Sequence, residues 1–185
     1  MSASADTLFE SLRSLQAEYE HSLPPVEQWH PQLSGDFDMR IDREGKWFHE
    51  GGQLTRPAMV KMFASILKRE GDEYFLVTPV EKWRIKVDEA PFVFVALRTE
   101  QEAGVEAVVL TTNIGNEVLI GPEHPLWVEQ TAAGEPRPMA LVHHNLPGLL
   151  NRNVFYQLVD LCEVDANNEL VFTSCGERYS IGSAG

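Results

Sequence analysis

The chain has few cysteines and no long apolar run, and each shortage excludes a class of protein. Only two cysteines, Cys162 and Cys175, occur among the 185 residues. A small secreted domain held together by disulfides is therefore excluded, and we expect two thiols rather than a bridge. No apolar stretch approaches the roughly 20 residues that a membrane-spanning helix needs. The composition predicts a globular protein with a core of its own.

Basic residues are also scarce. Lysine and arginine number 15 against 28 acidic residues, which gives a net charge of −13. Proteins that bind the phosphates of nucleic acid present a basic surface, so a nucleic-acid partner is disfavoured, as is docking on anionic lipid. The first residues, 1–6, lack the basic start and apolar centre of a secretory signal. These features predict a cytoplasmic protein.

The short motifs of common enzymes and metal sites do not occur. Gly51-Gly52 and Gly115 are turn glycines outside any phosphate-binding loop, and there is no Gly-x-Ser-x-Gly elbow or His-Glu-x-x-His pair. His143 and His144 are neighbours, and neighbours on a strand point to opposite faces, so they cannot chelate one ion together. We expect no metal and no cofactor.

One pattern of residue types occurs twice, at a constant spacing of 96 residues. Residues 55–85 align with residues 151–181 without a gap. Each copy opens with a polar residue and an arginine, continues with an apolar helical pattern, and ends in two β-patterned segments joined by a turn. This agreement predicts an internal duplication. One copy is too small to bury its own apolar face, whereas two copies and a central meander can do so.

Helices and strands can be placed from periodicity and breakers. The N-terminal helix has an apolar stripe of Leu8, Leu12, Leu15 and Tyr19. A hairpin over 36–50 turns at Gly45, and the helix of the first copy has a stripe of Met59, Val60, Phe63, Ile66 and Leu67. The strands that we expect to follow are 73–78, 81–87, 92–97, 105–112, 117–120, 126–129 and 139–144, with 92–97 central and 126–129 at an edge.

The helix of the second copy has a stripe of Val154, Phe155, Leu158, Val159 and Cys162. We therefore predict an α+β fold with antiparallel sheets. Its parts are an N-terminal helix over 1–25, an N-terminal α+β domain over 26–89 and a C-terminal α+β domain over 90–185.

Several strings resemble a known bacterial family. They are Trp47, Arg56, the run 74–82, the step 87–92, Arg152 and Tyr156. In these residues the chain resembles the domain-of-unknown-function family DUF1285 over roughly residues 30–182. The resemblance implies a duplicated two-domain α+β protein whose C-terminal half is loosely similar to pleckstrin-homology-like barrels. It also implies a role in signalling and a binding site between the domains, and it supplies no catalytic residues.

The repeated polar residues are the best candidates for a site. Arg56 and Arg152 occupy the first turns of their helices, where positive charge opposes the helix dipole. A specific partner for each arginine would explain this placement. Glu81 and Glu177, at equivalent turns, could brace each copy through an ion pair. Alternatively, the arginines face a shared cleft and bind a carboxylate or phosphate.

A row of basic residues and three tryptophans can each be interpreted in a structural or a functional way. Lys82, Arg84 and Lys86 alternate along one strand. They either protect an edge strand from pairing with another chain or form a docking strip for an acidic partner. Trp29, Trp47 and Trp83 are either core residues or the walls of an apolar pocket.

We hypothesise a non-enzymatic binding or regulatory module that takes a protein segment or a small anionic ligand in the interdomain cleft. The predicted binding residues are Arg56, Arg152, Trp47, His49, Glu81 and Lys82. A small hydrolase that pairs His49 or His144 with Glu81 or Glu177 is the alternative. An architectural subunit with an exposed apolar patch around Leu8, Leu12 and Leu15 is a third possibility.

Overall fold

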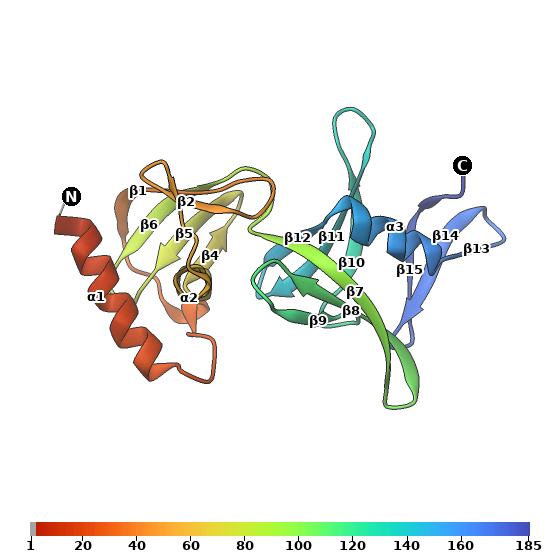
Figure 1. The fold of residues 1–185 in the computed structure, drawn as a ribbon, viewed down its shortest axis with the longest axis horizontal. Helices are drawn as coiled ribbons and strands as arrows, with labels where there is room; N and C mark the ends of the chain where they lie inside the picture. The colour runs from red at the N-terminus through yellow and green to blue at the C-terminus, as the bar shows by residue number, and fades with distance from the viewer. Residues whose placement is uncertain (1–2) are drawn as a thin grey trace. The chain divides into compact units, whose positions relative to one another are not determined.

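The computed structural model describes residues 3–185 and contains two compact units, one ending at Asp88 and the other beginning at Glu89. Met1 and Ser2, which belong to the N-terminus discussed above, lie outside the described residues. Each unit contains a six-stranded sheet, and most neighbouring strands are antiparallel (Figure 1). The predicted α+β class is confirmed.

The sheet of the first unit has the order β3-β2-β1-β6-β5-β4. Its strands are β1 Leu33–Ile41, β2 Trp47–His49, β3 Gly52–Gln53, β4 Leu67–Glu70, β5 Glu73–Val77 and β6 Lys82–Val87. The predicted hairpin is β1–β2, with Ile41 opposite Trp47. Gly45 has a φ of 79°, which glycine adopts readily at such a turn. The pair β1–β6 is parallel, which the sequence patterns did not indicate.

Two helices contribute to the core of this unit: α1, Ala3–Glu18, and α2, Pro57–Ser65. Leu8, Leu12 and Leu15 of α1 are at most 7% exposed. The helix therefore uses its apolar stripe inside its own unit. The exposed leucine patch expected of an architectural subunit is contradicted.

Helix α2 is shorter than predicted. The apolar stripe was extended through Ile66 and Leu67, but the helix ends at Ser65 and Leu67 begins β4. Ile66 accepts a hydrogen bond from the Val77 N–H at 2.9 Å, and Leu67 lies opposite Leu76 on β5. Strand pairing thus takes over where the helix stops, and a short apolar run does not distinguish the two structures.

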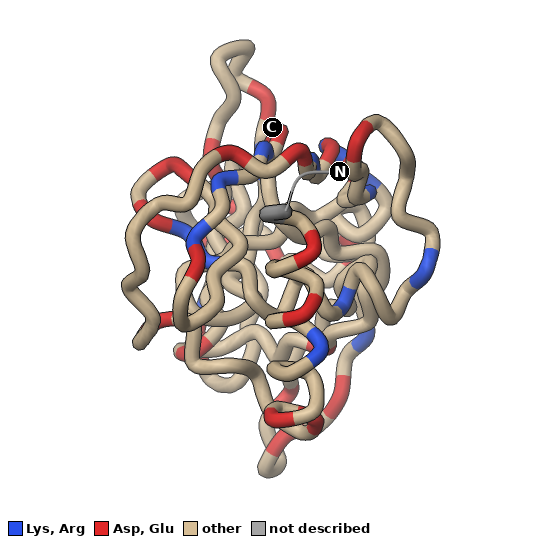
Figure 2. The backbone as a smooth tube through the Cα atoms, turned by 90° about the vertical axis from the view of Figure 1, so that its left-hand side faces the viewer, with Lys and Arg blue, Asp and Glu red and all other residues tan. Residues whose placement is uncertain are grey.

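The basic row lies on a central strand. Strand β6 has β1 on one side and β5 on the other, so the interpretation of Lys82, Arg84 and Lys86 as protection of an edge strand is wrong. Acidic and basic residues are interspersed along the backbone (Figure 2). No helix among residues 3–185 combines the length and the apolar character needed to cross a membrane.

The second unit has a sheet of the order β10-β11-β12-β7-β8-β9 and a separate three-stranded sheet, β13-β14-β15. Their bounds are β7 Phe92–Glu102, β8 Val105–Thr112, β9 Glu117–Leu119, β10 Leu126–Gln130, β11 Pro136–His143, β12 Leu146–Leu150, β13 Glu163–Val164, β14 Glu169–Ser174 and β15 Glu177–Ser183. Strand β7 is central and β10 is at an edge, as predicted.

Strand β12 is not among the predicted strands, and it contains Pro147 and Gly148, which are uncommon inside strands. It pairs with β7 in parallel, with Gly148 opposite Phe92. A Cβ atom on Gly148 would lie 2.5 Å from the Phe94 ring. Glycine here allows close packing rather than chain reversal.

The duplication is confirmed in the order of the elements. Helix α3, Arg152–Asp160, is followed by β13, β14 and β15, as α2 is followed by β4, β5 and β6. The strands β5 and β14 begin 96 residues apart, at Glu73 and Glu169. The sheets differ, however. The first hairpin joins the six-stranded sheet through β1, whereas the second pairs only with β13 within the described chain.

Candidate functional site

Two of the predicted binding residues lie on β2. Trp47 is 2% exposed and stacks on Phe63, so it is a core residue. The half-buried ring of His49 stacks on Phe37 at 5.0 Å. Its Nδ1 donates to the Asp38 carbonyl at 2.8 Å, because a carbonyl can only accept. The other ring nitrogen, Nε2, is buried without a hydrogen-bond partner among the described residues.

Arg56 and Arg152 are exposed at the starts of α2 and α3. Within residues 3–185 neither guanidinium group takes part in an ion pair or a side-chain hydrogen bond. The predicted bracing pairs with Glu81 and Glu177 are therefore wrong. Helix α3 is capped instead by Asn151, whose side chain accepts from the Val154 N–H at 2.8 Å. A binding role for the two arginines stays a prediction.

Lys82 is part of an internal ion-pair cluster. Its Nζ lies 2.7 Å from Glu70 Oε2 and 4.6 Å from the centre of the Phe75 ring. This hydrogen bond is the main cause that lowers the pKa of Glu70. Lys68, only 4% exposed, approaches the same carboxylate at 3.5 Å and donates to the Trp29 carbonyl at 2.8 Å. Lys82 is thus fully engaged by the fold.

Of the other two members of the basic row, Arg84 has internal partners, whereas Lys86 is exposed and forms no ion pair in the described chain. Arg84 lies 3.0 Å from Asp36 and 2.8 Å from Glu73. Glu81 closes the turn into β6, where its N–H donates to Thr78 Oγ1 at 3.0 Å. One of its carboxylate oxygens is buried without a hydrogen bond. The ion pairs of Lys82 and Arg84 occupy two of the three cations of the row, and the docking-strip interpretation stays a prediction.

The residues of the hydrolase alternative are not joined in the described chain. No hydrogen bond or ion pair links His49 with Glu81, or His144 with Glu177. His143 meets His144 edge to face, with 5.3 Å between ring centres. Burial, followed by the charges of His144 and His124, lowers the pKa of His143 to about 4. This ring is neutral at physiological pH.

The cysteines are free and half-buried. Cys162 was predicted on the helical stripe but lies beyond α3, which ends at Asp160. Burial raises the pKa of its thiol to about 11, and Sγ donates to the Leu158 carbonyl at 3.3 Å. Such a thiol is unreactive at neutral pH. Cys175 occupies the β14–β15 turn with a φ of 52°. In residues 3–185 no group of three ligand-type side chains is placed to hold a metal ion.

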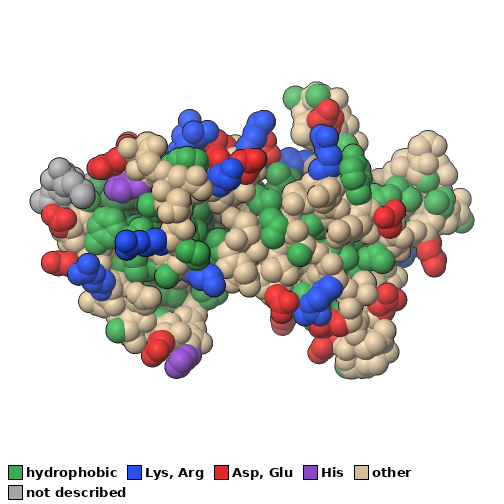
Figure 3. Space-filling view, viewed as in Figure 1, with side chains coloured by type: hydrophobic (Ala, Val, Ile, Leu, Met, Phe, Trp, Pro, Cys, Tyr) green, Lys and Arg blue, Asp and Glu red, His purple; other side chains and the backbone are tan. Residues whose placement is uncertain are grey.

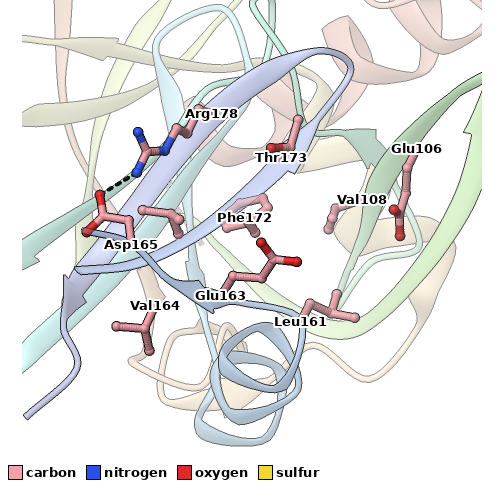
Figure 4. Close-up of a pocket in the computed structure, with 10 residues that line it drawn as sticks. Glu106, Val108, Leu161, Glu163, Val164, Asp165, Phe172, Thr173 and Arg178 are labelled. Carbon is pink, nitrogen blue, oxygen red and sulfur yellow. Dashed lines mark hydrogen bonds and ion pairs between the residues drawn. The ribbon is translucent and has the colours of Figure 1, made fainter. Parts of the chain in front are cut away.

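Two pockets are candidates for a ligand site. A groove of about 290 Å³ lies between α1 and α2, where hydrophobic side chains gather on the surface of the first unit (Figure 3). A larger pocket of about 450 Å³ lies in the second unit (Figure 4). The residues that line it are Glu106, Val108, Leu161, Glu163, Val164, Asp165, Val171, Phe172, Thr173 and Arg178. None of them was among the predicted binding residues.

The larger pocket lies where β14 continues beyond the end of β13 and β8 continues beyond the end of β9. Strand β13 pairs only with Leu170 and Val171 of β14, so no strand pairs with Phe172 and Thr173 on that side, and the end of β14 at Ser174 lies against β8. Strand β9 likewise pairs only with residues 109–111 of β8. Next to Thr173, the buried Ser174 hydroxyl joins β14 to β8 at Val108, which lines the pocket. It accepts from the Val108 N–H at 2.8 Å and donates to the Ile120 carbonyl at 2.6 Å.

The carboxylates of the pocket differ in their surroundings. Asp165 accepts the Glu169 and Asn167 N–H groups at 2.9 and 2.8 Å and forms an ion pair with Arg178. These contacts, the Glu169 N–H first, lower the pKa of Asp165. Glu106 and Glu163 are exposed and have no such partner among the described residues. They extend from opposite walls, with Leu161 at the same opening (Figure 4).

The duplication contains a signal that could have located this pocket. Glu163 and Thr173 stand 96 residues after Leu67 and Val77. Leu67 and Val77 are fully buried, whereas Glu163 and Thr173 are exposed. The second copy therefore has polar residues where the first has core residues. Positions that are apolar in the first copy and polar in the second therefore identify residues that line the pocket.

Comparison with known proteins identifies the family of both units. Residues 24–90 match the model of the DUF1285 N-terminal domain, a domain of unknown function, and residues 91–181 match the DUF1285 C-terminal domain. No curated protein matched.

Two solved structures are similar to the chain. A DUF1285 family protein from Silicibacter pomeroyi DSS-3 is 39% identical, with a TM-score of 0.83 over 95% of this chain and 94% of that one. Another, from Shewanella baltica OS155, is 30% identical, with a TM-score of 0.53 over 66% of this chain and 91% of that one. The chain belongs to the DUF1285 family.

Proposed function

We propose that the protein is a non-enzymatic binding module of a regulatory, signalling type, and that it captures a protein segment in the pocket of its second unit. The observation that carries this proposal is the open edge of β14 inside a pocket of about 450 Å³. An unpaired strand edge offers backbone donors and acceptors to an incoming chain. The volume is within the range of sites that hold several side chains.

Exposed aliphatic residues beside this edge support the same function. Leu161 is 40% exposed and Val164 is 58% exposed. Both line the pocket and would lose contact with water when a segment binds. Val108, Val171 and Phe172 also line the pocket and add apolar contacts for a bound segment.

A small anionic ligand is the second candidate. The exposed guanidinium groups of Arg56 and Arg152, which lack partners in the described chain, favour it. Calorimetric titration with inorganic phosphate tests this candidate. It predicts heat of binding that Arg56→Gln and Arg152→Gln each reduce, and unchanged heat in both variants would contradict it.

The main proposal is tested by selecting peptides from a random display library on the full-length protein. Affinities are then measured by fluorescence anisotropy against a pocket variant, Leu161→Arg. The matched control is Val80→Arg, because Val80 is 73% exposed in the first unit. We expect at least a tenfold loss of affinity in Leu161→Arg and none in Val80→Arg. Selected peptides that bind all three proteins equally would overturn the pocket as the site.

A further inference from the structure

We infer that the pocket of the second unit recognises an extended segment that carries a lysine or arginine, with its cationic end between Glu106 and Glu163. The inference rests on the proposed function and adds the chemical class of the partner. It makes these two carboxylates the residues that determine specificity.

Of the carboxylates that line the pocket, Asp165 already has partners within the fold. Asp165 is occupied by the turn into β14 and by Arg178. Glu106 and Glu163 have no counterion within the described residues and come from opposite walls of one opening (Figure 4). An ammonium or guanidinium group placed there would be attracted by both carboxylates and would offset one of their two negative charges. With a net charge of −13, the protein also attracts basic partners and repels acidic ones.

The first copy shows that the fold does not require a carboxylate at this position. Leu67, the equivalent of Glu163, is fully buried and packs beside Leu76 in its sheet. An apolar residue therefore serves the architecture of the repeat. The Glu163 side chain is exposed and forms no ion pair or hydrogen bond in the described chain, so it does not replace that packing. The Glu163 carboxylate therefore has no evident role in stabilising the fold, and binding a cation would explain its presence.

The open strand edge determines the conformation of the partner. Beyond Val171, alternate residues of β14 direct their N–H and C=O groups away from β15, where no β13 residue lies opposite. A chain that pairs with this edge is extended, and its residues i and i+2 share one face. One such position can reach the glutamates and the next can cover Leu161 or Val164. The expected motif is a basic residue two positions from an aliphatic one.

The composition of the selected peptides tests the partner class directly. Among peptides whose binding Leu161→Arg weakens, we expect lysine or arginine two positions from valine, leucine or isoleucine. Changing that basic residue to norleucine should weaken binding at least tenfold, and changing it to glutamate should abolish it. Raising NaCl from 50 to 500 mM should weaken binding further.

Charge-neutral variants of the protein provide the matched comparison. Glu163→Gln and Glu106→Gln should each weaken binding about fivefold or more. Glu123→Gln, an exposed change in the same unit that does not line the pocket, should have no effect. All three positions are exposed, so folding should be unaffected. If the peptide pairs with β14, N-methylation of its alternate backbone amides should weaken binding, because it removes the N–H donors of the pairing.

The outcomes separate the two proposals. Pocket-dependent peptides without a basic residue, or with affinities unchanged in Glu163→Gln and Glu106→Gln, overturn the basic partner and leave peptide binding intact. Methylated peptides that bind as well as their parents overturn the extended pairing. A selection that yields no pocket-dependent peptide overturns the proposed function and this inference together.

Discussion

Acid should destabilise the second unit through His143. The pKa of this ring is lowered from 6.5 to about 4, chiefly because burial removes water, with the charges of His144 and His124 adding to the effect. Its Nδ1 is buried without a hydrogen bond, and Phe92 packs against it edge to face at 5.5 Å. The folded unit therefore has no acceptor ready for an added proton at this nitrogen.

The sign and size of the effect follow from the two pKa values. Below pH 6.5 the unfolded chain binds a proton at His143 that the folded chain does not bind until about pH 4. The free energy of unfolding therefore falls as the pH drops through this window. The loss is about 2 kcal/mol at pH 5 and about 3 kcal/mol at pH 4. That is a large part of the total stability of a domain of this size.

Urea unfolding at several pH values, followed by amide resonances of the second unit, measures this effect. Carboxylates also titrate here, so the informative quantity is the difference between wild type and His143→Phe. The difference should shift by about 3 kcal/mol between pH 7.5 and pH 4. His21→Gln, at a side chain that is 92% exposed, is the control and should follow wild type. An imidazole pKa of 6 or above for His143, measured by NMR, would refute the reasoning.

Three other changes test the packing and the turns. Phe63→Ala removes a fully buried ring from α2 and should lower the unfolding free energy by about 3–5 kcal/mol in urea titrations; a loss below about 1 kcal/mol would show that the ring does not anchor the helix. Gly148→Ala places a Cβ 2.5 Å from the Phe94 ring and should destabilise the second unit by about 1–3 kcal/mol; an unchanged thermal midpoint would contradict the close contact. Asp165→Asn removes a carboxylate of lowered pKa, whose stabilisation is present above about pH 4 and is lost as the pH falls through the folded value. The urea midpoint of this variant should therefore vary less between pH 5 and pH 3 than that of wild type, and equal slopes would argue against these contacts.

Local patterns predicted much of the fold. The helical spacing of the leucines in α1, the glycine that turns β1 into β2 and the unbroken apolar start of β7 are all properties of neighbouring residues. The duplication was visible because both copies keep one spacing. The ends of α2 and α3 were placed too late, because Ile66 and Cys162 continue the apolar pattern after the helix has stopped.

Non-local strand pairing explains what the sequence did not reveal. The parallel pairs β1–β6 and β12–β7 join distant segments, and no periodicity within either segment records the partner. The pocket of the second unit has the same origin, because it depends on where β13 and β9 stop pairing. Two residues predicted to bind a ligand have structural contacts instead, Trp47 in the core and Lys82 in an ion pair.

One pair of equivalent hydroxyl groups shows how the two copies diverged. Thr78 and Ser174 stand 96 residues apart, and both are fully buried. Thr78 accepts the Glu81 N–H and so closes a turn within its own hairpin. Ser174 instead joins β14 to the segments around Val108 and Ile120. In the first copy the strand next to the hairpin is β1, and the hydroxyl serves only the turn. In the second copy no such strand pairs with the hairpin, and the hydroxyl holds it against β8 at one end only. Phe172 and Thr173, next to Ser174, line the pocket, so equivalent hairpins form part of a six-stranded sheet in one copy and one side of a pocket in the other.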